Sequence, residues 1–354
     1  MTLLIAEAGV NHNGSLDMAL RLIDAAAEAG ADLVKFQTFR AQNLASRQAP
    51  KAAYQMCHTD AAESQFDMLR KLELAEEAHD RLMEHCRACG IGFLSTPFDL
   101  DSLGLLVRKG VRQLKLGSGD LTNAPLLLAI GRSQLPLILS TGMATLGEVE
   151  ATLGALAFGY LRREDPPSRD AFEDARSSPE GAAILANNVT LLHCTTEYPA
   201  PLADVNLRAM DTLVAAFGLP VGYSDHTEGI AVAIAAAARG AAVIEKHLTL
   251  DRKLPGPDHA ASLEPMDWKA LVQAVRDVEI ALGDGRKIAR PGERRNIAIA
   301  RKSLVAARPI AIGESFSLDN LTCKRPGYGR SPFDYWSLLG RPASRAYGPD
   351  EEIE

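Results

Sequence analysis

The sequence predicts an α/β protein in which a parallel (β/α)8 barrel, the TIM-barrel fold, is followed by a small, mainly β domain. Short apolar runs alternate with longer helix-period segments eight times before Gly283. Beyond that glycine the pattern changes to short strand-like pieces broken by Gly and Pro. The 354 residues exceed the roughly 250 that one barrel needs, which leaves room for a second domain.

The apolar runs are short and lie between helical segments, as buried parallel strands do. We expect eight strands, at Leu3–Ala8, Leu33–Phe36, Gly92–Ser95, Gln113–Leu116, Leu135–Ser140, Val189–His193, Val221–Tyr223 and Val243–Glu245.

The intervening segments carry helix start and stop signals. Ser15 is a good N-cap for a first helix that runs to about Ala29, and Gly30 is placed to end it. The seventh helix, Ile230–Arg239, is rich in Ala and ends at Gly240 in the same way, and the eighth is expected at about Pro265–Leu282.

One stretch interrupts this regular pattern. Tyr160–Ala182 contains a charged run, Arg162–Asp165, followed by Pro166-Pro167-Ser168. We interpret it as a mobile surface insertion between the fifth helix and the sixth strand.

The domain boundaries follow from the change of pattern. We expect a catalytic barrel over residues 1–283, a polar linker over 284–300 and a second domain over 301–354. Strand-like pieces in that domain are Ser303–Ala306 and Leu321–Lys324. A domain of this size is too small for a large core of its own.

Composition excludes several classes of function. A formal charge of -7 argues against nucleic acid as the main partner, since phosphate backbones require a basic face. No apolar run approaches the roughly 20 residues of a membrane span, and the start lacks the pattern of a signal peptide. Five scattered cysteines favour a reducing cytoplasm over a disulfide framework.

The pair Cys86 and Cys89, next to His85, suggests a zinc site. No second cysteine pair stands at finger spacing, and the two cysteines are one helical turn apart near the expected core. We therefore expect them to be buried spectators.

Polar residues follow every predicted strand. Barrel enzymes build their sites at the C-terminal ends of the strands, where these side chains would gather. Lys35 and Glu245 stand directly inside apolar runs, where a charged group needs partners. The sequence therefore predicts a ligand site at this end of the barrel.

The residue types indicate which ligands fit. Lys35 and Lys115, with the hydroxyls of Thr96 and Ser118, could hold a phosphate or carboxylate. The backbone amides of Gly117–Gly119 add further donors.

A metal site is expected beside this anion site. His226 and His247 end neighbouring strands and could share a divalent metal, with Glu245 nearby and water in the open positions. Such a site suits a Lewis acid that polarises a carbonyl, and it would accept Mn²⁺, Mg²⁺ or Co²⁺.

Several long motifs resemble the sialic acid synthase family, whose members carry a C-terminal antifreeze-like (SAF) domain. The tail resembles that domain at Ala300–Leu304 and Lys324–Gly327. The barrel motifs are Ala6–Gly14, Val34–Thr38, Leu94–Phe98, Lys115–Asp120, Leu139–Met143, His193–Pro199, Gly222–Thr227, Glu245–His247 and Pro255–Asp258.

The resemblance implies a role for individual residues. His226 and His247 would bind the metal, with Mn²⁺ as the first expectation and Mg²⁺ or Co²⁺ as alternatives. Glu7 or Glu245 would move protons. Arg325 would reach the partner's barrel in a domain-swapped homodimer and hold the N-acyl group of the sugar. Phosphoenolpyruvate would contact Lys35, Thr96, Lys115, Ser118, Thr196 and Ser224, and the amino sugar would contact Glu7, Gln37, Tyr198 and Asp258.

The implied reaction joins phosphoenolpyruvate to the open-chain aldehyde of an N-acyl amino sugar, with C–O cleavage and release of phosphate. The main expectation is N-acetylmannosamine as acceptor, giving N-acetylneuraminate. The alternative is 2,4-diacetamido-2,4,6-trideoxy-mannose, giving N,N'-diacetyllegionaminate. Pseudaminate synthesis, a synthase for a phosphorylated aldose, a Schiff-base aldolase using Lys35 or Lys115, and a non-catalytic sugar-binding barrel are weaker alternatives.

Overall fold

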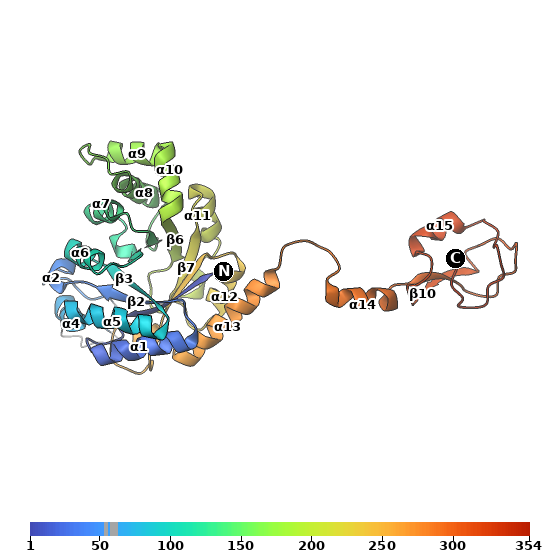
Figure 1. Cartoon of the computed structure of the whole chain (residues 1–354), viewed down its shortest axis with the longest axis horizontal. Helices are drawn as coiled ribbons and strands as arrows, with labels where there is room; N and C mark the ends of the chain where they lie inside the picture. The colour runs from blue at the N-terminus through green and yellow to red at the C-terminus, as the bar shows by residue number, and fades with distance from the viewer. Residues whose placement is uncertain (53–55, 57–62) are drawn as a thin grey trace. The chain divides into compact units, whose positions relative to one another are not determined.

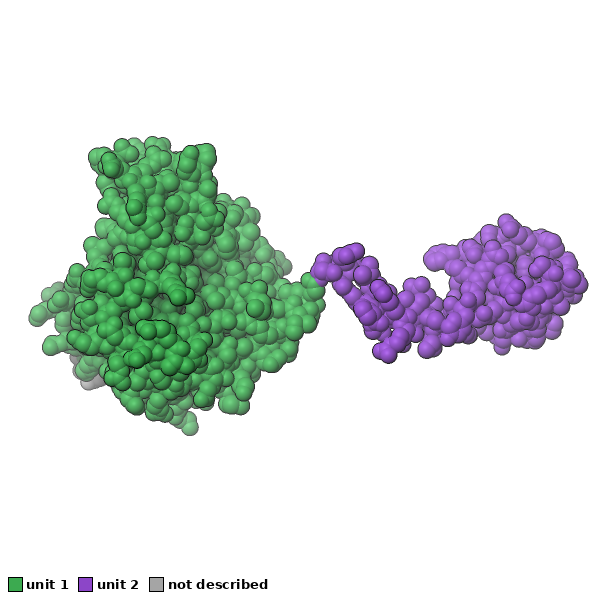
Figure 2. Space-filling model, viewed as in Figure 1, with its two compact units in different colours: residues 1–283 green, residues 284–354 purple. Residues whose placement is uncertain are grey.

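The computed structural model describes residues 1–52, 56 and 63–354. The chain divides into two compact units, Met1–Gly283 and Asp284–Glu354, which are coloured separately in Figure 2. Among the helices of the described residues, none combines the length and the apolar character needed to cross a bilayer.

The first unit is the predicted barrel (Figure 1). All pairings in its eight-stranded sheet are parallel, in the order β3-β2-β1-β8-β7-β6-β5-β4, and β3 packs beside β4. The strands are β1 (Leu3–Gly9), β2 (Leu33–Thr38), β3 (Gly92–Pro97), β4 (Leu114–Leu116), β5 (Leu137–Ser140), β6 (Val189–Cys194), β7 (Val221–Asp225) and β8 (Val243–His247).

Helices cover the outside of these strands (Figure 1). The first begins after the predicted cap, where Ser15 accepts a hydrogen bond from Met18 N, and ends at Gly30, whose φ is 84°. The helices are α1 (Leu16–Ala29), α2 (Ala41–Leu44), α4 (Gln65–Leu72), α5 (Glu76–Cys89), α6 (Leu100–Arg108), α7 (Ala124–Ser133), α8 (Leu146–Tyr160), α11 (Ala209–Phe217), α12 (Ala231–Ala238) and α13 (Pro265–Leu282).

The barrel interior begins with an apolar layer. A separate cluster of buried side chains, one from each of five strands, comprises Ile5, Leu94, Ile138, Leu192 and Val243. Side chains alternate along a strand, so the residue two positions farther on also faces inward. That step leads from the apolar layer to the polar layer described below.

The stretch expected as a mobile insertion is helical instead. After α8 come α9 (Arg169–Ser177) and α10 (Pro179–Asn188). Ser168 and Ser178 cap these two helices by accepting backbone N–H bonds, and Ala175 and Leu185 are buried. The prediction was wrong because two cap signals among the charged residues start helices whose apolar faces can pack.

The second unit has its own small core. Strands β9 (Ser303–Ala306) and β10 (Leu321–Lys324) pair antiparallel, and a short helix, α15 (Tyr335–Leu338), follows. Leu304, Phe316 and Leu338 belong to its buried cluster. The segment expected as a linker contains a helix, α14 (Pro291–Ala300), where Glu293 accepts the N–H of Arg290 at 3.0 Å.

Candidate active site

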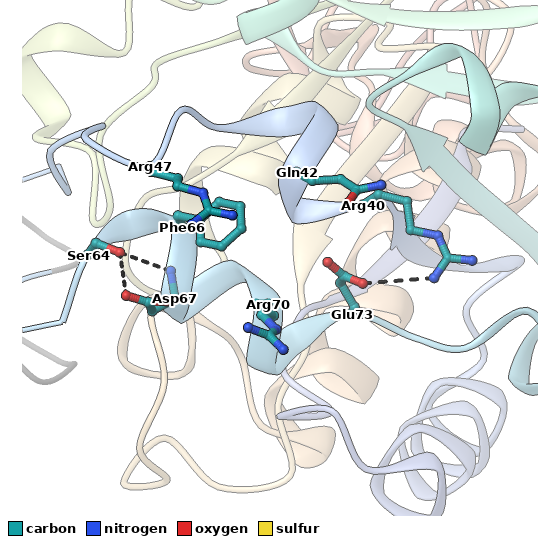
Figure 3. A pocket seen from close by; sticks show the side chains of 8 residues that line it. All are labelled: Arg40, Gln42, Arg47, Ser64, Phe66, Asp67, Arg70 and Glu73. Atoms are coloured by element: carbon teal, nitrogen blue, oxygen red, sulfur yellow. Dashed lines mark hydrogen bonds and ion pairs between the residues drawn. The ribbon is translucent and has the colours of Figure 1, made fainter.

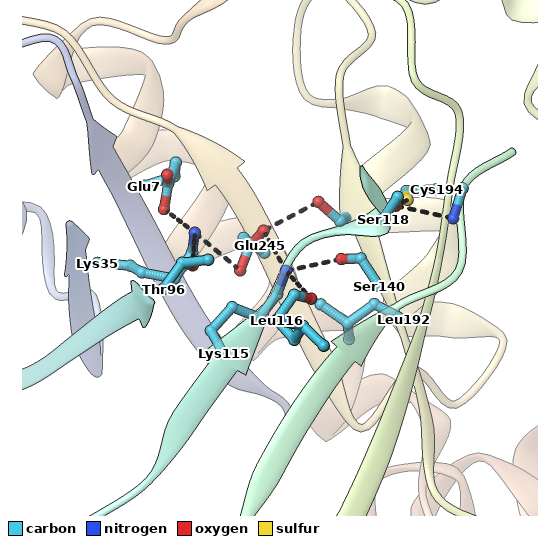
Figure 4. Close-up of polar contacts among 12 residues, drawn as sticks. Glu7, Lys35, Thr96, Lys115, Leu116, Ser118, Ser140, Leu192, Cys194 and Glu245 are labelled. Atoms are coloured by element: carbon cyan, nitrogen blue, oxygen red, sulfur yellow. Dashed lines mark hydrogen bonds and ion pairs between the residues drawn. The ribbon is translucent and has the colours of Figure 1, made fainter. Parts of the chain in front are cut away.

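Two lysines share one carboxylate in the polar layer of the barrel (Figure 4). Lys35 Nζ lies 3.8 Å from Glu245 Oε2, and Lys115 Nζ lies 3.5 Å from Glu245 Oε1. Lys35 also forms an ion pair with Glu7, its register partner on β1. All four side chains are buried, so these charges depend on one another.

Each inward position follows from the apolar layer. Glu7 stands two residues after Ile5, and Glu245 stands two residues after Val243. Thr96 and Ser140 follow Leu94 and Ile138 in the same way. The period of the strand thus places polar groups directly above an apolar floor.

The two carboxylates differ in their electrostatics. Burial, reinforced by the charge of Glu245, raises the pKa of Glu7 despite the nearby Lys35. Burial acts on Glu245 in the same direction, but Lys115 and Lys35 outweigh it and lower the pKa of Glu245. Glu245 is therefore the fixed anion, and Glu7 is the carboxyl group more readily protonated.

The lysines differ as well. Burial lowers the pKa of Lys115. Burial acts likewise on Lys35, but Glu245 and Glu7 raise its pKa above the usual value. An additional anion would therefore gain most from Lys115, whose ammonium has less compensation from carboxylates.

Hydroxyl side chains stand at or just after the ends of β4, β5 and β6, and that of Ser140 contacts Lys115. Lys115 Nζ donates to Ser140 Oγ at 2.7 Å, while Ser118 Oγ accepts from the N–H of Gly142 at 2.9 Å and contacts Cys194 Sγ at 3.2 Å. Thr196 Oγ1 is buried and has no hydrogen-bond partner within the described part of the chain. The missing side chain of Gly142 lets these groups approach its backbone closely, since a Cβ there would lie 2.8 Å from Ser118 Oγ and 2.9 Å from Cys194 Sγ.

The remaining hydroxyls lie beside the lysines and Glu245. Thr96 Oγ1 accepts from Lys35 Nζ at 3.3 Å, and Ser224 Oγ donates to Glu245 Oε1 at 3.1 Å. The structure thus brings the predicted anion-site residues to one end of the barrel. Ser140, to which the sequence analysis assigned no role, belongs with them; its inward position on β5 was the available signal.

The two predicted metal ligands converge. The ring centroids of His226 and His247 are 5.8 Å apart, and the Tyr198 ring lies 4.2 Å from that of His226. Burial lowers the pKa of His226 to about 4 and that of His247 well below its usual value. Both imidazoles are therefore neutral near pH 7, the form that binds a metal.

The hydrogen bonds of these histidines also fit a metal. His226 Nδ1 lies 2.6 Å from the carbonyl oxygen of Thr195 and so carries the proton, which leaves Nε2 as the ligand atom. His247 Nδ1 is buried without a hydrogen-bond partner in the described regions. Within the described residues, no third His, Cys, Asp or Glu donor forms a compact group with these two imidazoles. Water or substrate would therefore complete the coordination of a bound metal.

A third carboxyl group completes this end of the barrel. Asp258 Oδ2 lies 3.9 Å from His247 Nδ1. Burial, together with the charge of Glu7, raises the pKa of Asp258 to about 7. Near neutral pH this side chain can therefore either donate or accept a hydrogen bond.

A hydrogen-bonded chain holds the Asp258 loop against β1. Asn11 Nδ2 donates to Leu248 O and to Ser262 Oγ, both at 2.9 Å, and Ser262 Oγ donates to the Asp258 carbonyl oxygen at 2.7 Å. Gln37 Nε2 donates to Glu7 Oε1 at 3.2 Å. Gln37, Glu7 and Asp258 therefore lie on the β1, β2 and β8 side.

Two further features belong to other elements of the chain. Arg325 belongs to the second unit, where it is exposed just after β10. A pocket of about 560 Å³ between α2 and α4 is lined by residues outside the predicted site, among them Arg40, Arg47 and Arg70 (Figure 3).

Comparison with known proteins identifies the family. The model of the NeuB family matches residues 22–287, and that of the SAF domain matches residues 301–353. An N,N'-diacetyllegionaminic acid synthase of Campylobacter jejuni is 50% identical over 99% of this chain and 98% of its own length. One of Legionella pneumophila is 44% identical, over 95% of this chain and 89% of its own.

Solved structures agree with this result. An N-acetylneuraminic acid synthetase from Leptospira borgpetersenii, crystallised with citrate, is 33% identical with a TM-score of 0.67, over 84% of this chain and 90% of its own. The predicted fold, family and enzymatic nature are confirmed. The chain belongs to the NeuB family of synthases, with a SAF domain after the barrel.

Proposed function

We propose that this enzyme condenses phosphoenolpyruvate with the open-chain aldehyde of 2,4-diacetamido-2,4,6-trideoxy-mannose, giving N,N'-diacetyllegionaminate and phosphate. The two relatives at 50% and 44% identity carry the name of that synthase. The human N-acetylneuraminate-9-phosphate synthase is 33% identical and the Campylobacter jejuni pseudaminic acid synthase 32%. The higher sequence identities therefore favour 2,4-diacetamido-2,4,6-trideoxy-mannose, the alternative acceptor, over N-acetylmannosamine, the main expectation.

One observation carries the proposed chemistry: two buried lysines flank a single carboxylate, one of them also bonds the Ser140 hydroxyl, and two neutral imidazoles lie at the same end of the barrel. The lysines and hydroxyls suit the phosphate and carboxylate of phosphoenolpyruvate. The imidazoles suit a divalent ion near the acceptor.

The chain's own residues would act as follows. Lys115, Ser118, Ser140 and Thr196 would hold the phosphate, and Lys35 and Thr96 would hold the carboxylate of phosphoenolpyruvate. With the reactants so oriented, C3 of phosphoenolpyruvate attacks the aldehyde carbon, and water adds at C2. The resulting tetrahedral intermediate loses phosphate by C–O cleavage, and the lysines stabilise the departing charge.

Glu7 is the better candidate for moving protons, because burial raises its pKa and so makes it more readily protonated than Glu245, whose pKa is lowered. It would give a proton to the aldehyde oxygen as the C–C bond forms and receive one from the attacking water. Glu245, held as an anion, would orient Lys35, Lys115 and Ser224.

His226 and His247 would hold the metal, for which we propose Mn²⁺, with Mg²⁺ or Co²⁺ as alternatives. The bound ion would supply Lewis acidity to the acceptor carbonyl. Tyr198, Gln37 and Asp258 would contact the sugar.

We further propose that the enzyme works in the cytoplasm as a domain-swapped homodimer. Arg325 from the second unit of one copy would hold an N-acyl group in the barrel of the other. The exposure of Arg325 within its own unit supports such a role.

A side-by-side assay of the acceptors tests the proposal. Phosphate release from phosphoenolpyruvate is measured with Mn²⁺ and with 2,4-diacetamido-2,4,6-trideoxy-mannose or N-acetylmannosamine, and the first should give the higher kcat/KM. Equal or better turnover of N-acetylmannosamine would refute the proposed acceptor.

The variant His226→Ala tests the metal site. It should lose metal-dependent turnover, and its undiminished activity would refute the ligand assignment.

Isotope labelling tests the bond that breaks. With ¹⁸O in the bridging position of phosphoenolpyruvate, the label should leave with phosphate. Retention of the label in the sugar product would show P–O cleavage and exclude this mechanism. Borohydride trapping with pyruvate should give no covalent adduct, since neither lysine is proposed to form a Schiff base.

A further inference from the structure

Three side chains that can bind metal meet between α1 and α5, outside the barrel and on different elements from the proposed active site. Asp24 comes from α1, and His85 and Cys89 come from α5. His85 and Cys89 are four residues apart, so they share one face of their helix. These two helices pack against each other (Figure 1).

The donor atoms are close together. His85 Nε2 lies 2.6 Å from Asp24 Oδ1, and Cys89 Sγ lies 3.5 Å from the same oxygen. All three donors lie within 4.8 Å of one another, one from each residue. In a tetrahedral zinc site, neighbouring donors are about 3.3–3.8 Å apart, given metal–ligand bonds of about 2.0–2.3 Å.

The two cysteines of α5 turn out to differ. Cys86 is 1% exposed in the main core, as expected of a spectator. Cys89 is only partly buried and faces Asp24, so the expectation that both cysteines are buried was wrong for Cys89. A residue three positions from Cys86 lies about 60° away around a helix, which is enough to separate a core side chain from one at the helix boundary.

The site also has room to adjust. The side chain of Asp24 is 47% exposed and that of His85 32% exposed, so the carboxylate can rotate and present either oxygen. Solvent access on this side allows water to be the fourth ligand. A thiolate, an imidazole and a carboxylate together favour a borderline-soft divalent ion, whereas Mg²⁺ prefers oxygen donors alone.

We propose that Asp24, His85 and Cys89 bind one Zn²⁺-class ion that ties α1 to α5. This site is separate from the pair His226 and His247, and it does not depend on the function proposed above. Its role would be structural, because it links the helix after β1 to the helix before β3 without reaching the polar layer of the barrel.

The test is a cobalt titration of the full-length protein after removal of metal with a chelator. Co²⁺ bound to a thiolate gives an intense charge-transfer absorption in the near ultraviolet, which imidazole and carboxylate ligands alone do not give. We expect one equivalent of this signal in the wild-type protein, and its loss when Zn²⁺ is added.

Matched variants assign the signal. Cys89→Ser should abolish it, whereas Cys86→Ala, one helical turn away, should keep it. His226→Ala should also keep it, which separates this site from the proposed catalytic one. Asp24→Asn, a change at an exposed position, should weaken the affinity for Zn²⁺ that is measured by competition with Co²⁺. We expect a loss of roughly 10–100-fold or more, because loss of an outer-shell partner alone has an effect of that size.

Two results would overturn the proposal. The first is absence of the absorption in the wild-type protein. The second is its persistence in Cys89→Ser, which would assign the signal to another cysteine.

Discussion

Lys246 and Asp225 form an ion pair of 2.7 Å between side chains with no exposed surface. Lys246 Nζ also donates to the carbonyl oxygen of Thr227, and Asp225 Oδ1 accepts from Thr227 N and Oγ1. The pair thus fixes the turn after β7 to the end of β8. Because each residue directly precedes a predicted metal ligand, it also fixes the backbone that carries both imidazoles.

Lys246→Met should destabilise the protein by about 3–5 kcal/mol, since it leaves Asp225 buried without its counter-charge. Urea unfolding followed by circular dichroism measures this loss. The double variant Lys246→Met with Asp225→Asn should recover part of it. Asp211→Asn, which breaks the more exposed ion pair with Arg239, should cost at most about 1 kcal/mol. If Lys246→Met and Asp211→Asn lost similar amounts of stability, the buried ion pair would not have the role assigned to it.

Gly142→Ala should raise the KM for phosphoenolpyruvate on the order of tenfold and should destabilise the fold by about 1–3 kcal/mol. A methyl group there would lie 2.8 Å from Ser118 Oγ and 2.9 Å from Cys194 Sγ, and it would meet Thr196 Oγ1 as well. Steady-state kinetics measures the change. Gly147→Ala is the control, because a methyl group at that position in α8 meets no atom of the described residues within 4 Å beyond its own stretch of helix. An unchanged KM in Gly142→Ala would argue against a phosphate site here.

Glu7→Gln and Glu245→Gln should have different kinetic effects. Loss of the proton-transfer group in Glu7→Gln should lower kcat roughly 10²–10⁴-fold, while the KM for phosphoenolpyruvate should change less than in Glu245→Gln, because Glu7 pairs with Lys35 alone among the described basic residues. Glu245→Gln frees both lysines from their shared anion, so it should change that KM along with kcat. If Glu245→Gln alone lost kcat at constant KM, the two roles would be reversed.

Asp258 should make stability depend on pH in the metal-free and substrate-free protein. Its pKa is about 7 in the folded state against 3.8 ordinarily, so its protonated form stabilises the fold below pH 4. That contribution is lost as pH rises from about 4 to about 7, at up to about 1.4 kcal/mol per pH unit.

Comparison with Asp258→Asn isolates this effect, because the amide does not titrate. The free energy of unfolding of the wild type relative to the variant should fall between pH 4 and pH 7 and stay level above pH 7. Asp170→Asn, at an exposed position, controls for loss of a carboxylate in general. A difference that does not vary with pH would show that Asp258 ionises normally.

The alternation of apolar runs and capped helices was enough to predict the barrel and its eight strands, although six of the strands run one or two residues beyond the predicted end. Ser15 and Gly30 bound the first helix as expected, because capping depends on residues next to the helix end. The two-residue period of β1 likewise placed Glu7 on the same face as Ile5. These are local relations, and a linear sequence contains them.

Other features depend on residues far apart in the chain. Closure of the barrel sets Lys115 and Lys35 on either side of Glu245. The two lysines lower the pKa of Glu245, whereas burial and the charge of Glu245 raise the pKa of Glu7. The packing of α5 on α1 turns Cys89 toward Asp24 and Cys86 into the core. The local sequence pattern thus determined which side chains face inward. Distances, burial and charge balance arose only when distant strands and helices came together, because each of them depends on neighbours that the linear order does not specify.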